Sequence, residues 1–179
     1  MKQSTLNSHR ILALAPSSRG VGFAVMENIA TLVDWGVRSI KGDKNAASLA
    51  RIGELIDLYQ PEKVILQDVR AKGSRRSKRI QELGEQIQAL TIQRNVKTAL
   101  YSPRQIRQTF FGEEPGTKHR QAQLLAARFP EELESRLPPK RRAWESEDSR
   151  MDIFEAVALV LTAKSRRPSP RRGNQTTKR

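Results

Sequence analysis

The sequence predicts an α/β fold in which helices cover both faces of a five-stranded mixed sheet. Three short apolar strand candidates follow one another closely, at Arg10–Leu14, Val21–Met26 and Ala30–Arg38. Two more, Lys63–Val69 and Val96–Tyr101, alternate with segments of helical periodicity. Strands joined by tight turns pair antiparallel, whereas strands joined through helices pair parallel. We therefore expect three antiparallel strands followed by helix-linked parallel strands in one sheet.

The helices are predicted from apolar side chains that recur every three or four residues. They are Ala46–Tyr59, Ser74–Asn95, a short helix opened by Ser102-Pro103, Lys118–Phe129 and Asp148–Ala163. Proline after Gln60 and proline after Phe129 are expected to end the first and fourth of these helices. The stretch 131–146 lacks a helical period and is expected to be irregular.

With 179 residues, the chain can form one domain with a buried core. We expect a loose leader over residues 1–9, a folded domain over 10–164 and a basic, disordered tail over 165–179. The chain contains no cysteine, which excludes disulfides and thiolate metal sites. No apolar run reaches the roughly 18 residues of a membrane helix, and the N-terminus lacks the apolar core of a signal peptide. We therefore expect a cytoplasmic protein without a membrane partner.

The chain is strongly basic. It carries 33 lysines and arginines against 19 acidic residues, a formal net charge of +14. Such an excess favours a polyanionic partner, of which nucleic acid is the commonest. Much of this charge lies inside the predicted domain, which favours nucleic-acid binding over a merely solubilising tail.

Two motifs indicate a functional site. The hairpin Ile11–Met26 reads ILALAPSSRGVGFAVM, two apolar strands around a polar turn. The last predicted helix carries Asp152 and Glu155, which are three residues apart and therefore share one helix face. The rest of that helix is apolar and is expected to pack on the sheet. Two acids at the start of a packed helix indicate site residues rather than a solvated surface.

In element order and motifs, the chain resembles the RuvC family of Holliday junction resolvases, within the ribonuclease H-like superfamily. The resemblance rests on Ile11–Val25, on Pro61–Val69, on Tyr101–Gly112 (YSPRQIRQTFFG) and on the helix segment Asp152–Ala158. Together these segments cover about residues 10–163 in the family's order. The resemblance implies a ribonuclease H-like fold and metal-dependent, structure-selective cleavage of branched DNA.

The resemblance also implies which residues form the catalytic site. Two hard divalent ions, Mg²⁺ or Mn²⁺, would be held by converging carboxylates. Ala15 stands at the family's first-strand Asp position and Gln67 at its fourth-strand Glu position, while Asp152 and Glu155 are retained; Lys118 matches a basic catalytic position. Ala15 has no ligand atom and Gln67 brings no charge. With only Asp152 and Glu155 as metal ligands, we expect weak or absent metal binding and negligible cleavage.

Asp68 is next to Gln67, but neighbouring side chains on a strand point to opposite faces. Asp68 could replace the missing ligand only if the strand slipped or bulged. An engineered inactivation and a natural loss would both give this pattern. We favour an inactivated form of an active nuclease.

Basic residues predict the binding surface. The densest cluster follows the strand that carries Gln67 and is expected to bind phosphates, with a solvated loop as the alternative; it comprises Lys72, Arg75, Arg76, Lys78 and Arg79. Arg19 in the opening turn is also expected to contact phosphate. Arg104 and Arg107 belong to the same predicted surface, because the resemblance places them near the scissile phosphate. Aromatic residues are few, and Trp35 and Trp144 are expected to be structural, Trp144 as an anchor of the loop before the last helix.

The leading hypothesis is therefore a RuvC-type endonuclease for Holliday-junction-like DNA with a disabled site. One alternative is a non-catalytic nucleic-acid-binding module, and another is a ribonuclease H-like enzyme acting on RNA or RNA–DNA hybrid. The resemblance implies a homodimer through the helix Ser74–Asn95, since a four-way junction presents two symmetric cuts. The basic first half of that helix leaves a monomer or another dimer open.

Overall fold

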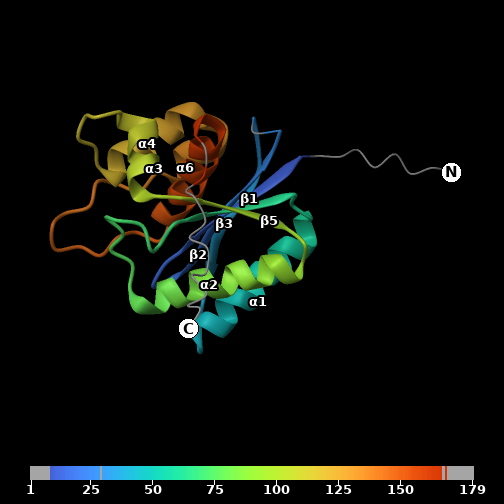
Figure 1. The fold of residues 1–179 in the computed structure, drawn as a ribbon. Coiled ribbons are helices and arrows are strands. Elements are labelled where there is room, and N and C mark those ends of the chain that lie inside the picture. Colours follow the sequence, from blue (N-terminus) through green and yellow to red (C-terminus); the bar gives the residue numbers. More distant parts are fainter. Residues whose placement is uncertain (1–8, 29, 167, 169–179) are drawn as a thin grey trace, which may run out of the picture.

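The computed structural model describes residues 9–28, 30–166 and 168, which form one five-stranded sheet between two layers of helices (Figure 1). The strands are β1 (Arg10–Pro16), β2 (Gly20–Glu27), β3 (Thr31–Ser39), β4 (Lys63–Gln67) and β5 (Lys97–Tyr101), in the spatial order β3-β2-β1-β4-β5. The first three pair antiparallel, whereas β4 is parallel to both β1 and β5. The predicted mixed sheet is confirmed.

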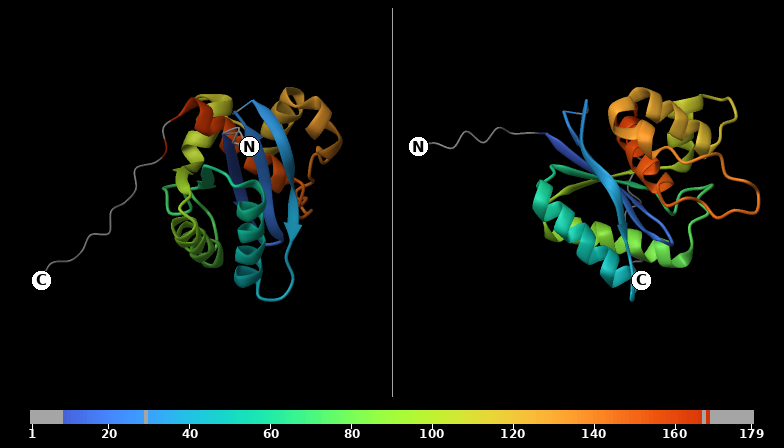
Figure 2. Two further views of the ribbon diagram at one scale, coloured as in Figure 1. Left: turned by 90° about the vertical axis from the view of Figure 1, so that its right-hand side faces the viewer. Right: turned by 180° about the vertical axis from the view of Figure 1, so that it is seen from behind.

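The helices divide between the two faces of the sheet (Figures 1 and 2). One face is covered by α1 (Lys44–Tyr59) and α2 (Lys78–Gln93). The other is covered by α3 (Pro103–Phe111), α4 (Lys118–Arg128) and α6 (Met151–Ser165), with the short α5 (Pro130–Leu133) and η1 (Glu134–Arg136) beside them. This division confirms helices on both faces.

Alternation along β1 decides which side chains meet which layer. Leu12 and Leu14 belong to the core formed with α1 and α2, whereas Ala13 and Ala15 belong to the core formed with α6. The same alternation in β4 places Leu66 toward α1 and α2, and Ile65 toward α6. Gln67, two residues after Ile65 at the end of β4, therefore extends on the α6 side.

Helix α6 packs unusually close to the sheet. A Cβ added at Gly22 of β2 would lie 2.3 Å from the carbonyl oxygen of Asp152, so the close approach requires glycine at this position. Most of α6 is buried, including Asp152, which is 1% exposed. The apolar residues of the helix hold Asp152 inside the protein next to the β1–β2 turn.

Several predicted boundaries differ from the structure. Helix α2 begins at Lys78 rather than Ser74, because Ser77 is the N-cap and its hydroxyl accepts from the backbone N–H of Ile80. Helix α6 begins at Met151 rather than Asp148. Pro130 ends α4 as predicted but also opens α5, since proline fits the first turn of a helix. The expectation that the whole stretch 131–146 is irregular was therefore wrong for residues 131–136, which form α5 and η1.

The predicted leader and tail fall largely outside the described residues, which exclude 1–8, 167 and 169–179. Within the described part of the chain, none of the helices has the length and apolar character to cross a bilayer.

Candidate functional site

The four positions that the family resemblance assigns to metal ligands converge at the C-terminal ends of β1 and β4. Parallel pairing of these strands brings their ends to the same edge of the sheet. Ala15, Gln67 and Glu155 line one cavity of about 480 Å³, which Lys118 of α4 also borders. Asp152 lies one helical turn from Glu155, against the β1–β2 turn. The structure thus brings together residues that the sequence separates by up to 140 positions.

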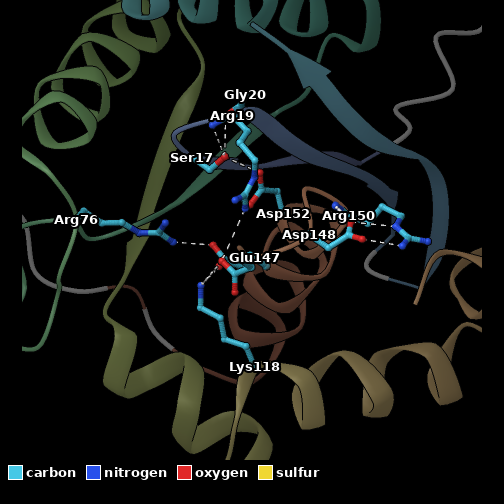
Figure 3. Close-up of polar contacts among 10 residues, drawn as sticks. Ser17, Arg19, Gly20, Arg76, Lys118, Glu147, Asp148, Arg150 and Asp152 are labelled. Carbon is cyan, nitrogen blue, oxygen red and sulfur yellow. Dashed lines mark hydrogen bonds and ion pairs between the residues drawn. The ribbon is translucent and has the colours of Figure 1, made fainter. Parts of the chain in front are cut away.

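Both carboxylate oxygens of Glu155 are taken by basic side chains of the protein. The Nη2 atom of Arg76 donates to Glu155 Oε2 at 2.6 Å and to the amide oxygen of Gln67 at 3.0 Å. Lys118 Nζ donates to Glu155 Oε1 at 2.5 Å. Figure 3 shows Arg76 and Lys118 approaching the start of α6 from two different elements. A guanidinium therefore links the two predicted metal-ligand positions 67 and 155.

Asp152 has a different environment. Its Oδ2 accepts a hydrogen bond from the Ser17 hydroxyl at 2.6 Å, within the β1–β2 turn (Figure 3). Burial, opposed by this hydrogen bond and reinforced by the nearby charge of Glu155, raises the pKa of Asp152 to about 6. The Ser17 hydroxyl also accepts a hydrogen bond from the backbone N–H of Arg19. The same hydroxyl therefore stabilises the turn and positions the side chain of Asp152.

A third acid extends the network toward the surface. Glu147, just before α6, accepts a hydrogen bond from Lys118 at 3.2 Å and forms an ion pair with Arg19 at 3.9 Å. Lys118 thus joins Glu147 to Glu155, and Arg19 joins the opening turn to Glu147 (Figure 3). The Nε of Arg19 is buried and has no hydrogen-bond partner among the described residues.

The ion pairs outweigh the cost of burial at the centre of this network. Burial alone would raise the pKa of Glu155, but the charges of Arg76 and Lys118 lower it below its usual value. Burial would likewise lower the pKa of Lys118 and of Arg76, yet Glu155 raises both. All three groups are therefore charged near neutral pH, and their charges compensate one another inside the protein.

The residues present do not fit the two-ion site that the family resemblance implies. Such a site needs several free carboxylate oxygens at close range. Within residues 9–28, 30–166 and 168, no group of three or more histidine, cysteine or acidic side chains is placed to hold a metal ion. The two oxygens of Glu155 already accept from cations, and Arg76 lies between the positions that would supply ligands.

Asp68 does not take the place of the missing ligand. Strand β4 ends at Gln67, and the Asp68 carboxylate instead accepts from the backbone N–H of Arg70. The Asp68 N–H donates to the carbonyl of Tyr101, which fixes the chain as it leaves the sheet. The prediction that Gln67, rather than Asp68, faces the site agrees with this arrangement.

The predicted basic residues divide into two groups. Three are half-buried and contact the protein itself, namely Arg19, Arg76 and Arg79. Arg79 donates to the carbonyl of Ser17 at 3.0 Å and to Asn45 at 2.9 Å. The members of the second group are exposed and form no hydrogen bond or ion pair with the described residues: Lys72, Arg75, Lys78, Arg104 and Arg107. Of these, Arg75 and Arg107 border the 480 Å³ cavity.

Sequence reasoning missed Ser17, whose hydroxyl donates to Asp152. A serine two residues after the expected Asp position was the available signal. Trp144 was expected to anchor its loop, but the side chain is 78% exposed, so that expectation was wrong. Its basic neighbours in the sequence were the available signal for an exposed role.

Comparisons with known proteins agree with the geometry at the level of fold. No protein-family description and no curated protein sequence matches the chain. RuvC of T. thermophilus in complex with a Holliday junction substrate superposes with a TM-score of 0.62 at 17% identity, covering 90% of this chain and 98% of that one. A second structure of Thermus thermophilus RuvC gives 0.61 at 16% identity, covering 86% and 92%.

The yeast mitochondrial Holliday junction resolvase is a more distant neighbour. It gives a TM-score of 0.54 at 12% identity, covering 87% of this chain and 77% of that one. These structures share the mixed sheet, three antiparallel strands followed by parallel ones, that the sequence predicts. The chain therefore has the RuvC-type, ribonuclease H-like α/β fold.

Proposed function

We propose that this protein binds branched DNA through its RuvC-type fold and does not cleave it. The observation that carries this proposal is the Arg76 guanidinium, which donates to both Gln67 and Glu155 where the family resemblance implies metal ligands. An internal cation here compensates the charge of Glu155 without any divalent ion. Retention of the fold together with loss of the ligand set supports a binding role.

Exposed cations support a polyanionic ligand. Five exposed basic residues can contact phosphates without breaking any contact among the described residues: Lys72 and Arg75 in the loop after β4, Lys78 at the start of α2, and Arg104 and Arg107 on α3. Of these, Arg75 and Arg107 border the 480 Å³ cavity. Lysine and arginine contacts to phosphates supply most of the sequence-independent affinity of DNA-binding proteins.

The choice of branched DNA over other nucleic acids rests on the fold. The T. thermophilus RuvC that this chain resembles in structure is described in complex with a Holliday junction substrate. The same shape with a basic cavity edge suits a branch point, where strands diverge from a common centre. RNA–DNA hybrid remains the competing ligand from the ribonuclease H-like superfamily, and the binding experiment includes it.

Fluorescence anisotropy with four labelled ligands tests the proposal. A four-way junction, a continuous duplex of equal length, an RNA–DNA hybrid and a single strand are titrated with the protein in EDTA, and again in Mg²⁺ and in Mn²⁺. We expect the tightest binding to the junction, equal affinity with and without metal, and intact strands on a denaturing gel. Equal affinity for all four ligands, or cleavage in either metal, would contradict it.

A homodimer through α2 belongs to the same proposal. Helix α2 packs on α1 and leaves Ile92 69% exposed at its end. A second copy could cover this apolar side chain and would place two binding sites on one symmetric junction. Light scattering coupled to size exclusion distinguishes the dimer from a monomer, and Ile92→Glu is expected to shift a dimer toward the monomer.

A further inference from the structure

The loop between η1 and α6 carries an exposed tryptophan that no contact of the fold explains. Trp144 is 78% exposed, the largest exposed fraction among the large apolar side chains of the described residues. A large aromatic side chain carries much apolar surface, and most of the surface of Trp144 is available to a bound ligand. The loop lies on the same side of the molecule as the basic loop after β4 (Figures 1 and 2).

Backbone contacts hold Trp144 in a defined turn. The Arg142 N–H donates to the Glu145 carboxylate at 2.9 Å, and the Glu145 N–H donates to the Arg142 carbonyl at 3.1 Å. These two bonds close a turn with Trp144 near its tip. At the base of the loop, the His119 ring contacts the carbonyl of Pro138 at 3.1 Å, which ties the loop to α4.

The surroundings of the indole are cationic. Lys140, Arg141 and Arg142 are all exposed, and the Arg142 guanidinium lies 5.7 Å from the centre of the Trp144 ring. A planar guanidinium covers only one face of the ring, which leaves the other face for a planar group. An aromatic side chain flanked by cations matches what stacking on a base with its phosphate requires.

The loop is connected to the candidate site. Lys140 and Arg141 line a cavity of about 510 Å³ together with Lys118 and Glu147. Lys118 and Glu147 belong to the ion-pair network around Glu155. A strand that followed this cavity from the site would meet the basic loop and its tryptophan.

We infer that Trp144 stacks on an unpaired base of the bound DNA, while Lys140, Arg141 and Arg142 contact the flanking phosphates. This inference rests on the proposed DNA binding and adds the element that recognises unpaired bases. Continuous duplex offers no free base face, so Trp144 contributes to binding of branched or unpaired DNA and not to binding of plain duplex.

Tryptophan fluorescence tests the inference directly, because the chain contains only two tryptophans. In a Trp35→Phe background, Trp144 is the sole tryptophan and can be excited at wavelengths that tyrosine does not absorb. Its emission is expected to fall when a junction with an unpaired base at the branch is added. In the wild-type background, Trp144→Ala is expected to weaken binding of that junction about tenfold. Trp144→Phe should retain most of the affinity, and plain duplex should bind all three proteins equally.

Leu58→Ala is the matched control, since Leu58 is another large apolar side chain, 65% exposed, on α1. It should change neither affinity nor emission. If the wild-type protein binds the junction but Trp144→Ala binds it equally well, or if Trp144 emission does not change, the inference fails and the proposed function stands. If the wild-type protein binds none of the ligands, the proposed function fails and the inference falls with it.

Discussion

The Arg76–Glu155 ion pair allows the most specific test of the site. Arg76→Met keeps much of the side-chain length but removes the charge that lies 2.6 Å from Glu155. The two side chains are 22% and 17% exposed, so this ion pair is partly buried. Removing one partner of a buried pair costs about 3–5 kcal/mol, and of an exposed pair less than about 1 kcal/mol.

Lys118 limits the loss, because it remains bound to the other oxygen of Glu155. We therefore expect Arg76→Met to lower the free energy of unfolding by about 2 kcal/mol, between those two limits. Urea unfolding followed by circular dichroism at pH 7 measures this difference. Arg51→Met is the control, since it removes a pair with Glu54 whose side chains are 53% and 63% exposed.

The control should lose less than about 0.5 kcal/mol. A double-mutant cycle with Glu155→Gln then isolates the coupling, which is expected to be about 1–2 kcal/mol. If Arg76→Met were as stable as the control and the coupling were near zero, the guanidinium would not compensate Glu155 in solution, and the reasoning about the site would be refuted.

Three further predictions concern pH, metal and salt. The pKa of Asp152 is about 6 in the folded protein and near 3.9 in the unfolded chain, so between these pH values the folded state binds more protons. The free energy of unfolding is therefore expected to fall by about 2–3 kcal/mol as the pH rises through this range. Asp152→Asn should remove this fall in urea unfolding measured between pH 4 and pH 8. The double variant Ala15→Asp, Gln67→Glu should bind Mn²⁺ weakly, because Arg76 stays bound to the carboxylates at positions 67 and 155. Adding Arg76→Ala should raise the Mn²⁺ affinity at least tenfold, as measured by calorimetry. Equal affinity of the double and triple variants would argue against Arg76 as the internal cation. Arg107→Ala should reduce the salt dependence of junction binding by about one charge, whereas Arg51→Ala should leave it unchanged.

Much of the fold follows from local patterns. The apolar alternation of the hairpin 11–26 and the helical periods after it suffice to place the strands and helices, because each element buries one face. The convergence of positions 15, 67, 152 and 155 follows from the same topology once parallel strands end at one edge. Asp152 and Glu155 were recognisable because they begin a helix that is otherwise apolar and packs on the sheet. Burying a carboxylate there is costly unless other groups compensate its charge.

The destinations of the basic side chains could not be predicted in the same way. Arg75 and Arg76 are neighbours in one run of cations, yet Arg75 is exposed and Arg76 reaches Glu155, 79 positions away. Which arginine points inward depends on the path of the loop between β4 and α2 and on the helix cap at Ser77. Neither feature produces a periodic pattern in the sequence. Trp144 was misjudged for a related reason, since a turn that displays a side chain and a turn that buries it look alike in sequence.

Incubation of the wild-type protein with a labelled four-way junction, with and without divalent metal, tests the central claim most directly. Half of each reaction, in EDTA or in Mn²⁺, is run on a native gel and half on a denaturing gel. Binding of equal strength in both conditions, with every strand intact, is the result that an internally compensated, metal-independent site predicts. Strand cleavage in Mn²⁺, or binding that disappears in EDTA, would contradict it.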